Sequence, residues 1–138
     1  MGAGRRIEKE AEVETMRSVP LQVLADEQLG RARRFGGRAA YTVHGGPDHG
    51  LRQTVVALTR GFRLRQEADP AEATLQVLRG RVRLSTIEDR WDGVVGDQVT
   101  LPTRRHCLDA LQDSVILLTV HSDEPHTAAS LHKSKKPA

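Results

Sequence analysis

Between residues 39 and 120 the chain alternates short apolar runs with turn-forming residues, and this rhythm decides its fold class. The runs are rich in Val, Leu and Thr, and Gly, Pro or Asp interrupts them roughly every eight to twelve residues. Runs of this length are typical of β-strands, and their regular spacing is typical of a sandwich or barrel. We predict strands at residues 39–43, 53–59, 63–66, 73–78, 81–86, 90–94, 98–101, 107–110 and 115–120.

The residues before the predicted strands show the apolar spacing of a helix. Apolar residues recur at helical intervals through residues 20–34, Pro20 suits the start of a helix, and Gly36 with Gly37 suits its end. The residues of this stripe are Leu21, Leu24, Ala25, Leu29 and Ala32. The sequence therefore predicts an all-β domain preceded by one N-terminal helix.

Two glycines mark reversals between predicted strands. Gly80 separates two alternating runs where a hairpin requires positive φ, and Gly96 marks a second reversal. The alternating apolar positions on either side of these reversals are expected to be mostly buried. They are Leu75, Val77, Val82, Leu84, Val99, Leu101, Leu117 and Val120.

The 138 residues are enough for one domain around a single core. We expect a flexible N-terminal extension at residues 1–17, a folded domain at 18–120 and a flexible C-terminal tail at 121–138. The extension mixes basic residues with four glutamates and has no stripe of core-facing residues. These glutamates are Glu8, Glu10, Glu12 and Glu14.

Several features indicate a cytoplasmic protein with no membrane partner. No apolar run approaches the roughly 20 residues that cross a bilayer, and the charged N-terminal residues lack the apolar stretch of a secretory signal. The single cysteine, Cys107, cannot form an internal disulfide and excludes a zinc site built from several cysteines.

The formal net charge of +3 and the sequence pI near 9.5 raise the question of nucleic-acid binding. However, Arg63 and Arg65, like Arg81 and Arg83, alternate as one face of a strand does. The chain also has only one Trp, one Tyr and two Phe that could stack on bases. We therefore do not expect a nucleic-acid partner.

Two motifs within residues 53–120 resemble those of the cupin superfamily. Residues 73–80, ATLQVLRG, are similar to the strand that ends the first cupin motif, and residues 96–102, GDQVTLP, followed by His106 are similar to the second. The chain also resembles small single-domain bacterial cupins of unassigned role. The resemblance implies that residues 18–120 form a double-stranded β-helix, the jelly-roll barrel of cupins. It also implies a homodimer, because an open barrel edge and an N-terminal segment offer strand groups that association would cover.

Cupins that hold a metal usually supply two histidines and a glutamate from the first motif and one histidine from the second. Only His106 matches plainly, since the glutamate position falls on Ala73. The two histidine positions fall on Glu67 and Asp69 with one loop length, or on Gln66 and Ala68 with the other. We expect no cofactor. A replacement site for manganese, iron or zinc would have to use Glu67, Asp69, Glu72 and His106.

The other chemistry-bearing residues have simpler interpretations. Cys107 and His106 are neighbours in a strand, so they point to opposite faces and cannot form a catalytic pair. His44 and His49 could add imidazoles near the barrel mouth or belong to an ordinary loop. Trp91 and Phe62 are expected to be core residues. The histidines of the tail are expected to have no fixed role; they are His121, His126 and His132.

These observations favour two functions. In the first, the apolar barrel interior binds a small organic ligand, and polar residues at the mouth receive an anionic group. The residues proposed for this binding are His106, Arg104, Arg105 and Gln66. In the second, the carboxylate-rich site holds a metal and catalyses a reaction of dioxygenase or isomerase type on a small molecule.

Overall fold

The computed structural model describes residues 16–122 and contains one helix and nine strands in this range. Their bounds are α2 Leu21–Arg34, β1 Arg38–His44, β2 Leu51–Leu58, β3 Arg63–Gln66, β4 Glu72–Arg79, β5 Arg81–Ser85, β6 Arg90–Val94, β7 Gln98–Thr100, β8 His106–Ala110 and β9 Ser114–His121. Every predicted element is confirmed, with ends that shift by at most two residues. Most of the predicted extension and tail lies outside the described residues. The one helix that residues 16–122 form is not long and apolar enough to span a membrane.

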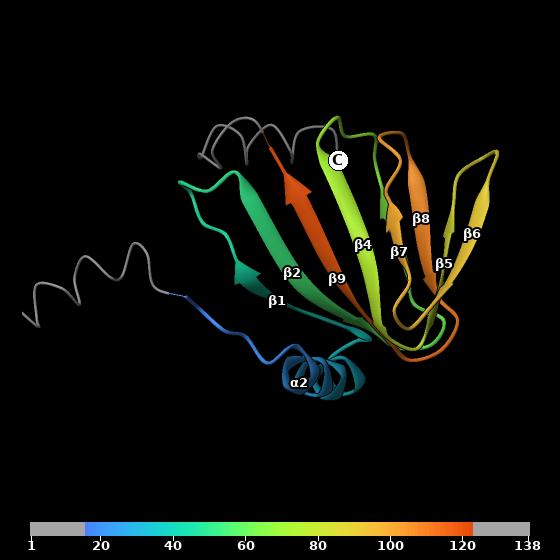
Figure 1. The fold of residues 1–138 in the computed structure, drawn as a ribbon. Coiled ribbons are helices and arrows are strands. Elements are labelled where there is room, and N and C mark those ends of the chain that lie inside the picture. Colours follow the sequence, from blue (N-terminus) through green and yellow to red (C-terminus); the bar gives the residue numbers. More distant parts are fainter. Residues whose placement is uncertain (1–15, 123–138) are drawn as a thin grey trace, which may run out of the picture.

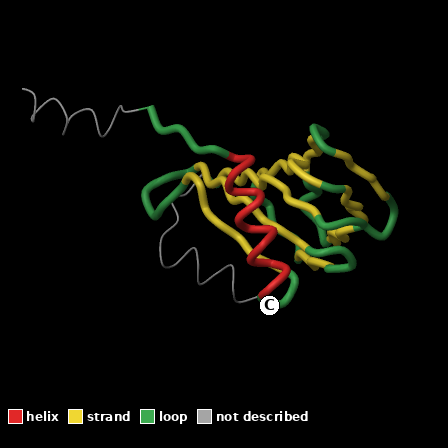
Figure 2. The backbone as a smooth tube through the Cα atoms, turned by 90° about the horizontal axis from the view of Figure 1, so that it is seen from below, coloured by secondary structure: helices red, strands yellow, loops and turns green. Residues whose placement is uncertain are grey.

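The strands form two antiparallel sheets that face each other (Figure 1). The five-stranded sheet has the order β1-β2-β9-β4-β7, and the four-stranded sheet has the order β3-β8-β5-β6. Helix α2 lies across the outer side of the five-stranded sheet, as the view from below shows (Figure 2). Among residues 16–122, no helix covers the outer side of the four-stranded sheet. Within residues 16–122, the sequence therefore correctly predicted a mostly β domain and the helix that precedes its strands.

The core has two parts, because the five-stranded sheet is apolar on both faces. An inner cluster between the two sheets joins Val56, Leu75 and Ile116 to Val82 and Leu84 of the opposite sheet. An outer cluster lies between α2 and the sheet and contains the helix residues Ala25, Leu29 and Ala32 together with the sheet residues Val55, Ala57, Leu78, Val115 and Leu117. Trp91 and Phe62 are partly buried against the inner cluster.

The predicted core residues divide between these two parts. Leu75, Val77, Val82 and Leu84 are buried in the inner cluster, whereas Leu117 is buried in the outer cluster under α2. The prediction of a single core was therefore too simple. Alternate residues of β9 point to opposite faces of the sheet, and Leu117 is on the face that packs against the helix. Val99, Leu101 and Val120 are only partly buried.

Ser114, at the start of β9, is 1% exposed and is bonded to two backbone segments. Its Oγ accepts a hydrogen bond from the Arg81 N–H at 3.1 Å and lies 2.7 Å from the carbonyl oxygen of Gln112. Gly80 packs against this residue with φ +77°, as the hairpin required, and a Cβ there would lie 2.4 Å from Ser114 Oγ. These contacts fix where β9 begins relative to β5.

Candidate functional site

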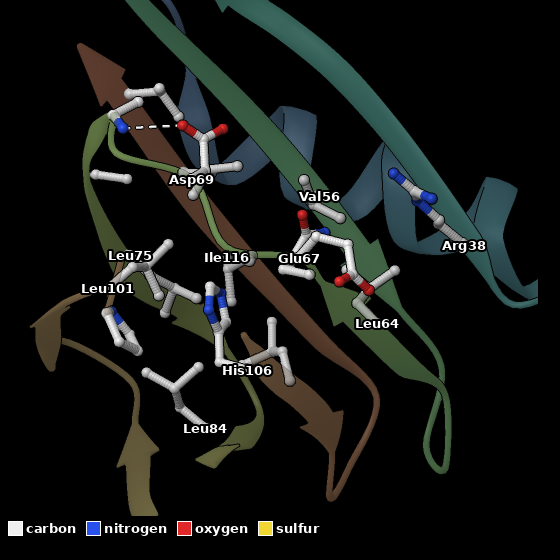
Figure 3. Close-up of a pocket in the computed structure, with 17 residues that line it drawn as sticks. Arg38, Val56, Leu64, Glu67, Asp69, Leu75, Leu84, Leu101, His106 and Ile116 are labelled. Atoms are coloured by element: carbon white, nitrogen blue, oxygen red, sulfur yellow. Dashed lines mark hydrogen bonds between the residues drawn. The ribbon is translucent and has the colours of Figure 1, made fainter. Parts of the chain in front are cut away.

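A cavity of about 150 Å³ lies between the two sheets (Figure 3). Side chains from both sheets and from the loop after β3 surround it. The apolar lining residues are Val56, Leu64, Ala71, Ala73, Leu75, Leu84, Leu101, Pro102, Leu108, Ile116, Leu118 and Val120. The polar lining residues are Arg38, Gln66, Glu67, Asp69 and His106. The cavity is therefore mainly apolar and has a few polar groups on its wall.

His106 is the polar residue held deepest in this wall, with 7% of its surface exposed. Figure 3 shows its imidazole among Leu75, Leu84 and Leu101. Its Nδ1 lies 2.9 Å from the carbonyl oxygen of Arg104. A carbonyl oxygen only accepts hydrogen bonds, so Nδ1 carries the proton of the neutral ring and Nε2 keeps a lone pair. His106 can therefore accept a hydrogen bond from a molecule in the cavity.

Gln66 is the partner of His106 across the strand pair β3 and β8. One step further along these strands Leu64 is the partner of Leu108, and all four residues line the cavity. Residues directly opposite each other in an antiparallel pair have Cβ atoms roughly 4.5–5.5 Å apart and share one face. The strand pair thus presents an amide beside the imidazole and apolar side chains next to both.

The four residues considered for a replacement metal site do not converge. Glu67 is bonded to Arg105 at 3.0 Å, and Asp69 Oδ1 accepts the Ala71 N–H at 2.8 Å. Glu72 is exposed on β4, is paired in register with His121 and is absent from the cavity lining. No group of three or more His, Cys, Asp or Glu side chains within residues 16–122 is placed to hold a metal ion.

The wall also lacks the ligand that the cupin motif would supply from β4. Ala73 lines the cavity with a methyl group, and His106 is the single histidine among the lining residues. One imidazole and two carboxylates that already have other partners do not provide a transition-metal site. The described residues therefore do not fit the metal that the resemblance to cupins implies.

Arg104 and Arg105 lie outside the cavity lining. Arg104 forms an ion pair with Glu88, and Arg105 forms one with Glu67 at 3.0 Å, with both arginine side chains more than half exposed. Together with His106 and Cys107 they line a second depression of about 410 Å³ beside the turn that joins β5 and β6. The structure thus brings His106 and Gln66 to the cavity, and it brings the two arginines to a second depression that His106 also lines.

Arg38 lines the cavity from β1, and sequence reasoning missed it. Figure 3 shows it on the side of the cavity formed by β1 and β2, beyond Val56. Arg38 immediately precedes the predicted strand at residues 39–43, in a charged stretch with no motif. No signal in the sequence marks this position, because only the pairing of β1 with β2 brings it beside the cavity.

The remaining candidates are placed as ordinary strand and loop residues. Cys107 is opposite Arg65 on β3 and Ser85 on β5, facing away from the cavity, as alternation within β8 requires. His44 and His49 are exposed, and their ring centroids are 5.3 Å apart in an edge-to-face arrangement. Neither of these histidines lines the cavity. His126 and His132 lie outside the described residues.

The sequence matches no family model and no curated protein, but its structure is similar to many solved structures. A cupin superfamily protein from Desulfitobacterium hafniense is 12% identical, with 64% of this chain and 80% of that chain covered and a TM-score of 0.57. The cupin domain of an XRE family transcriptional regulator from Enterobacter cloacae is 8% identical, covering 64% of this chain and 99% of that domain with a TM-score of 0.56. An HTH_3 family transcriptional regulator from Vibrio cholerae is 16% identical, covering 75% of this chain and 60% of that chain with a TM-score of 0.59.

The two named cupins in this comparison show that the chain has a cupin fold. The cupin fold indicated by residues 73–80 and 96–106 is therefore confirmed at the level of two antiparallel sheets with one helix over residues 16–122. Because every identity is low, the comparison establishes the fold and leaves the chemistry to the cavity itself.

Proposed function

We propose that the two sheets form the cupin double-stranded β-helix and that its interior binds a small, mainly apolar organic molecule with one hydrogen-bonding group. The observation that carries this proposal is the position of His106. Its free Nε2 is held in a wall of aliphatic side chains by the bond from Nδ1 to Arg104. A binding site of this kind uses apolar area for affinity and a few polar groups for orientation.

The size of the cavity limits the ligand. Drug-sized ligands occupy pockets of roughly 300–1,000 Å³, whereas a cavity of roughly 150 Å³ lined by Leu, Ile and Phe accommodates a molecule the size of benzene. The present cavity has a volume of about 150 Å³. The ligand is therefore comparable to a single substituted ring or a short branched chain.

The polarity of the wall sets the ligand's functional group. In the neutral ring His106 Nε2 accepts a hydrogen bond, and the Gln66 amide beside it can donate or accept. A hydroxyl group satisfies both residues, because it donates one hydrogen bond and accepts another. Arg104 and Arg105 are less suited to the ligand role expected from the sequence, because each is already bonded to a glutamate outside the cavity.

Two of the similar structures come from transcriptional regulators by their names. This likeness supports a binding or sensing module over an enzyme. A metal-dependent enzyme of dioxygenase or isomerase type has weaker support, because Glu67, Asp69, Glu72 and His106 do not meet.

Phenol and toluene test the proposal, since they have the same number of non-hydrogen atoms and differ in the hydroxyl. Titrations followed by amide chemical shifts and by calorimetry should show that both bind. Phenol should bind roughly 3–10-fold more tightly than toluene, because one hydrogen bond contributes a net free energy of that size. His106→Phe should remove this preference, whereas Val94→Ala, on an exposed strand edge, should preserve it.

A variant that fills the cavity provides the second arm. Ala73→Leu places a larger side chain in the lining and should abolish the binding of both probes. Failure of both probes to bind the wild-type protein, or equal binding by Ala73→Leu, would contradict the proposed function.

A further inference from the structure

The outer face of the four-stranded sheet concentrates arginines from three strands. The register makes Arg63 the partner of Asp109, Arg83 the partner of both Asp109 and Asp92, and Arg65 the partner of Cys107. Partners across a sheet share a face, so these side chains lie on the side away from the cavity. We call this surface the arginine face, and its charged residues are Arg63, Arg65, Arg81, Arg83, Arg90, Asp92 and Asp109.

The two aspartates neutralise only part of this charge. Arg63 pairs with Asp109 at 2.6 Å, and Arg83 pairs with Asp92 at 2.8 Å. Within residues 16–122, Arg65, Arg81 and Arg90 have no ion pair. The hydrogen bond from Arg83, followed by the charges of Arg83, Arg90 and Arg81, holds the pKa of Asp92 below its usual value. Three guanidinium groups thus remain available for an anionic partner.

The side chains between the arginines favour a carboxylate-bearing peptide over nucleic acid. Ser85 and Cys107 are small and stand between Arg65 and Arg90 in the register. Trp91 and Phe62, the large aromatic residues of this part of the fold, pack against the inner cluster instead. Single-stranded nucleic acids bind to surfaces that combine positive charge with exposed aromatic rings. The arginine face supplies the charge without such rings.

One segment of this chain has the complementary pattern. Residues 8–14 read EKEAEVE and lie outside the described residues, with glutamates at positions 8, 10, 12 and 14. In an extended conformation alternate residues point to one side, roughly 6.6–6.8 Å apart. Arg63 and Arg65 on β3, and Arg81 and Arg83 on β5, repeat at the same interval. Lys9 would then lie on the opposite side from the glutamates.

We propose that residues 8–14 of one copy bind in extended form to the arginine face of a second copy. The described chain begins on the side of β1 and α2, whereas β5 and β6 lie on the other side of the molecule (Figure 1). Glu14 is only two residues from Met16, so it stays within roughly 7 Å of that starting point. When the arginine face belongs to a second copy, the segment can reach it without having to cross its own molecule. The association produces the homodimer expected from the sequence and does not depend on a ligand in the cavity.

Sedimentation velocity of full-length variants tests the docking. Arg65→Gln with Arg81→Gln and Arg90→Gln should weaken self-association at least roughly tenfold, and Glu8, Glu10, Glu12 and Glu14, all changed to Gln, should do the same. A matched control changes three other exposed arginines, Arg31, Arg34 and Arg60, to Gln and should stay within roughly twofold of the wild type. Raising the salt concentration should weaken the wild-type dimer and have little effect on the first two variants.

A synthetic peptide of residues 5–16 provides the direct measurement. It should bind the Glu→Gln protein, whose own segment no longer competes, and should lose this binding when the three arginines are also changed. Self-association that neither variant weakens would overturn the proposal. So would a single-stranded oligonucleotide that binds the arginine face more tightly than the peptide, since it would identify the partner as nucleic acid.

Discussion

Gln66 and His106 are directly opposite each other on β3 and β8, and both line the cavity between the sheets. The cupin resemblance gave two alternatives for the first-motif histidines, and one of them fell on Gln66. The structure therefore places an amide next to the one histidine that the chain retains at this site. Ala73, the position of the motif glutamate, lines the same cavity.

This arrangement predicts that two substitutions rebuild a metal site. Gln66→His with Ala73→Glu would place two imidazoles and a carboxylate around one cavity, the donor set that zinc and iron favour. The wild-type protein should bind zinc, manganese and iron(II) weakly, and His106→Ala should change this little. Calorimetric titration should show submicromolar binding in the double variant. Tight wild-type binding that is lost in both His106→Ala and Glu67→Ala would show that the native residues do form a site.

The two parts of the core predict similar losses of stability at two leucines on opposite faces of the five-stranded sheet. Leu75→Ala in the inner cluster and Leu117→Ala under α2 should each lower the free energy of unfolding by roughly 2–5 kcal/mol. Chemical denaturation measures both effects, and the exposed Leu51→Ala is the control. Unchanged stability at Leu117 would mean that α2 does not cover the sheet.

Two glycines with positive φ form a matched pair. Gly80 and Gly96 have φ of +77° and +95°, but a Cβ at Gly80 would lie 2.3 Å from the Asp113 carbonyl oxygen, whereas Gly96 has open space. Gly96→Ala should therefore cost only the conformational penalty of roughly 1–2 kcal/mol. Gly80→Ala should lower the free energy of unfolding clearly more, because the backbone at Asp113 must also move to make room for the Cβ. Equal losses in denaturant titrations would contradict the close packing of Gly80.

Asp113 predicts a loss of stability in acid. It accepts the Arg60 N–H at 2.9 Å and pairs with Arg33 at 2.9 Å, and the first of these bonds and then the second lower the pKa of its carboxyl group below the usual 3.8. Its stabilisation is therefore complete above the unfolded-state pKa and is lost as the pH falls through the lower folded-state pKa. The Asp113→Asn variant should melt at a lower temperature than the wild type near pH 7. Its melting temperature should fall less than that of the wild type as the pH drops below 4. Asp48→Asn, on an exposed loop, should behave like the wild type throughout.

The strands were predictable from local pattern, and the cavity wall was only partly so. Turn residues such as Gly80 and Gly96 divide the sequence at the right places, so the number and order of the elements follow from it. Alternation also predicted that His106 and Cys107 face opposite ways. Arg38 could not be found in this manner, since it reaches the cavity through the pairing of β1 with β2.

The direction of side chains in the loops between strands could not be predicted either. Arg104 and Arg105 precede β8 in a loop, where no period constrains their orientation, and their partners Glu88 and Glu67 are distant in sequence. Leu117 shows a related limit. Residues 115–118 are all apolar, so their pattern does not reveal that Leu117 faces α2 while Leu118 faces the cavity.

The position of β9 determines the order in which the protein can fold during synthesis. This strand is the last of the described chain, yet it lies between β2 and β4 in the centre of the five-stranded sheet. Leu58 on β2 is the partner of Ser114, far along the chain, so the pairing closes a long loop. Until residues 114–121 leave the ribosome, β2 and β4 each expose an unpaired edge and two apolar faces. A nascent chain arrested before Ser114 should therefore depend on chaperones.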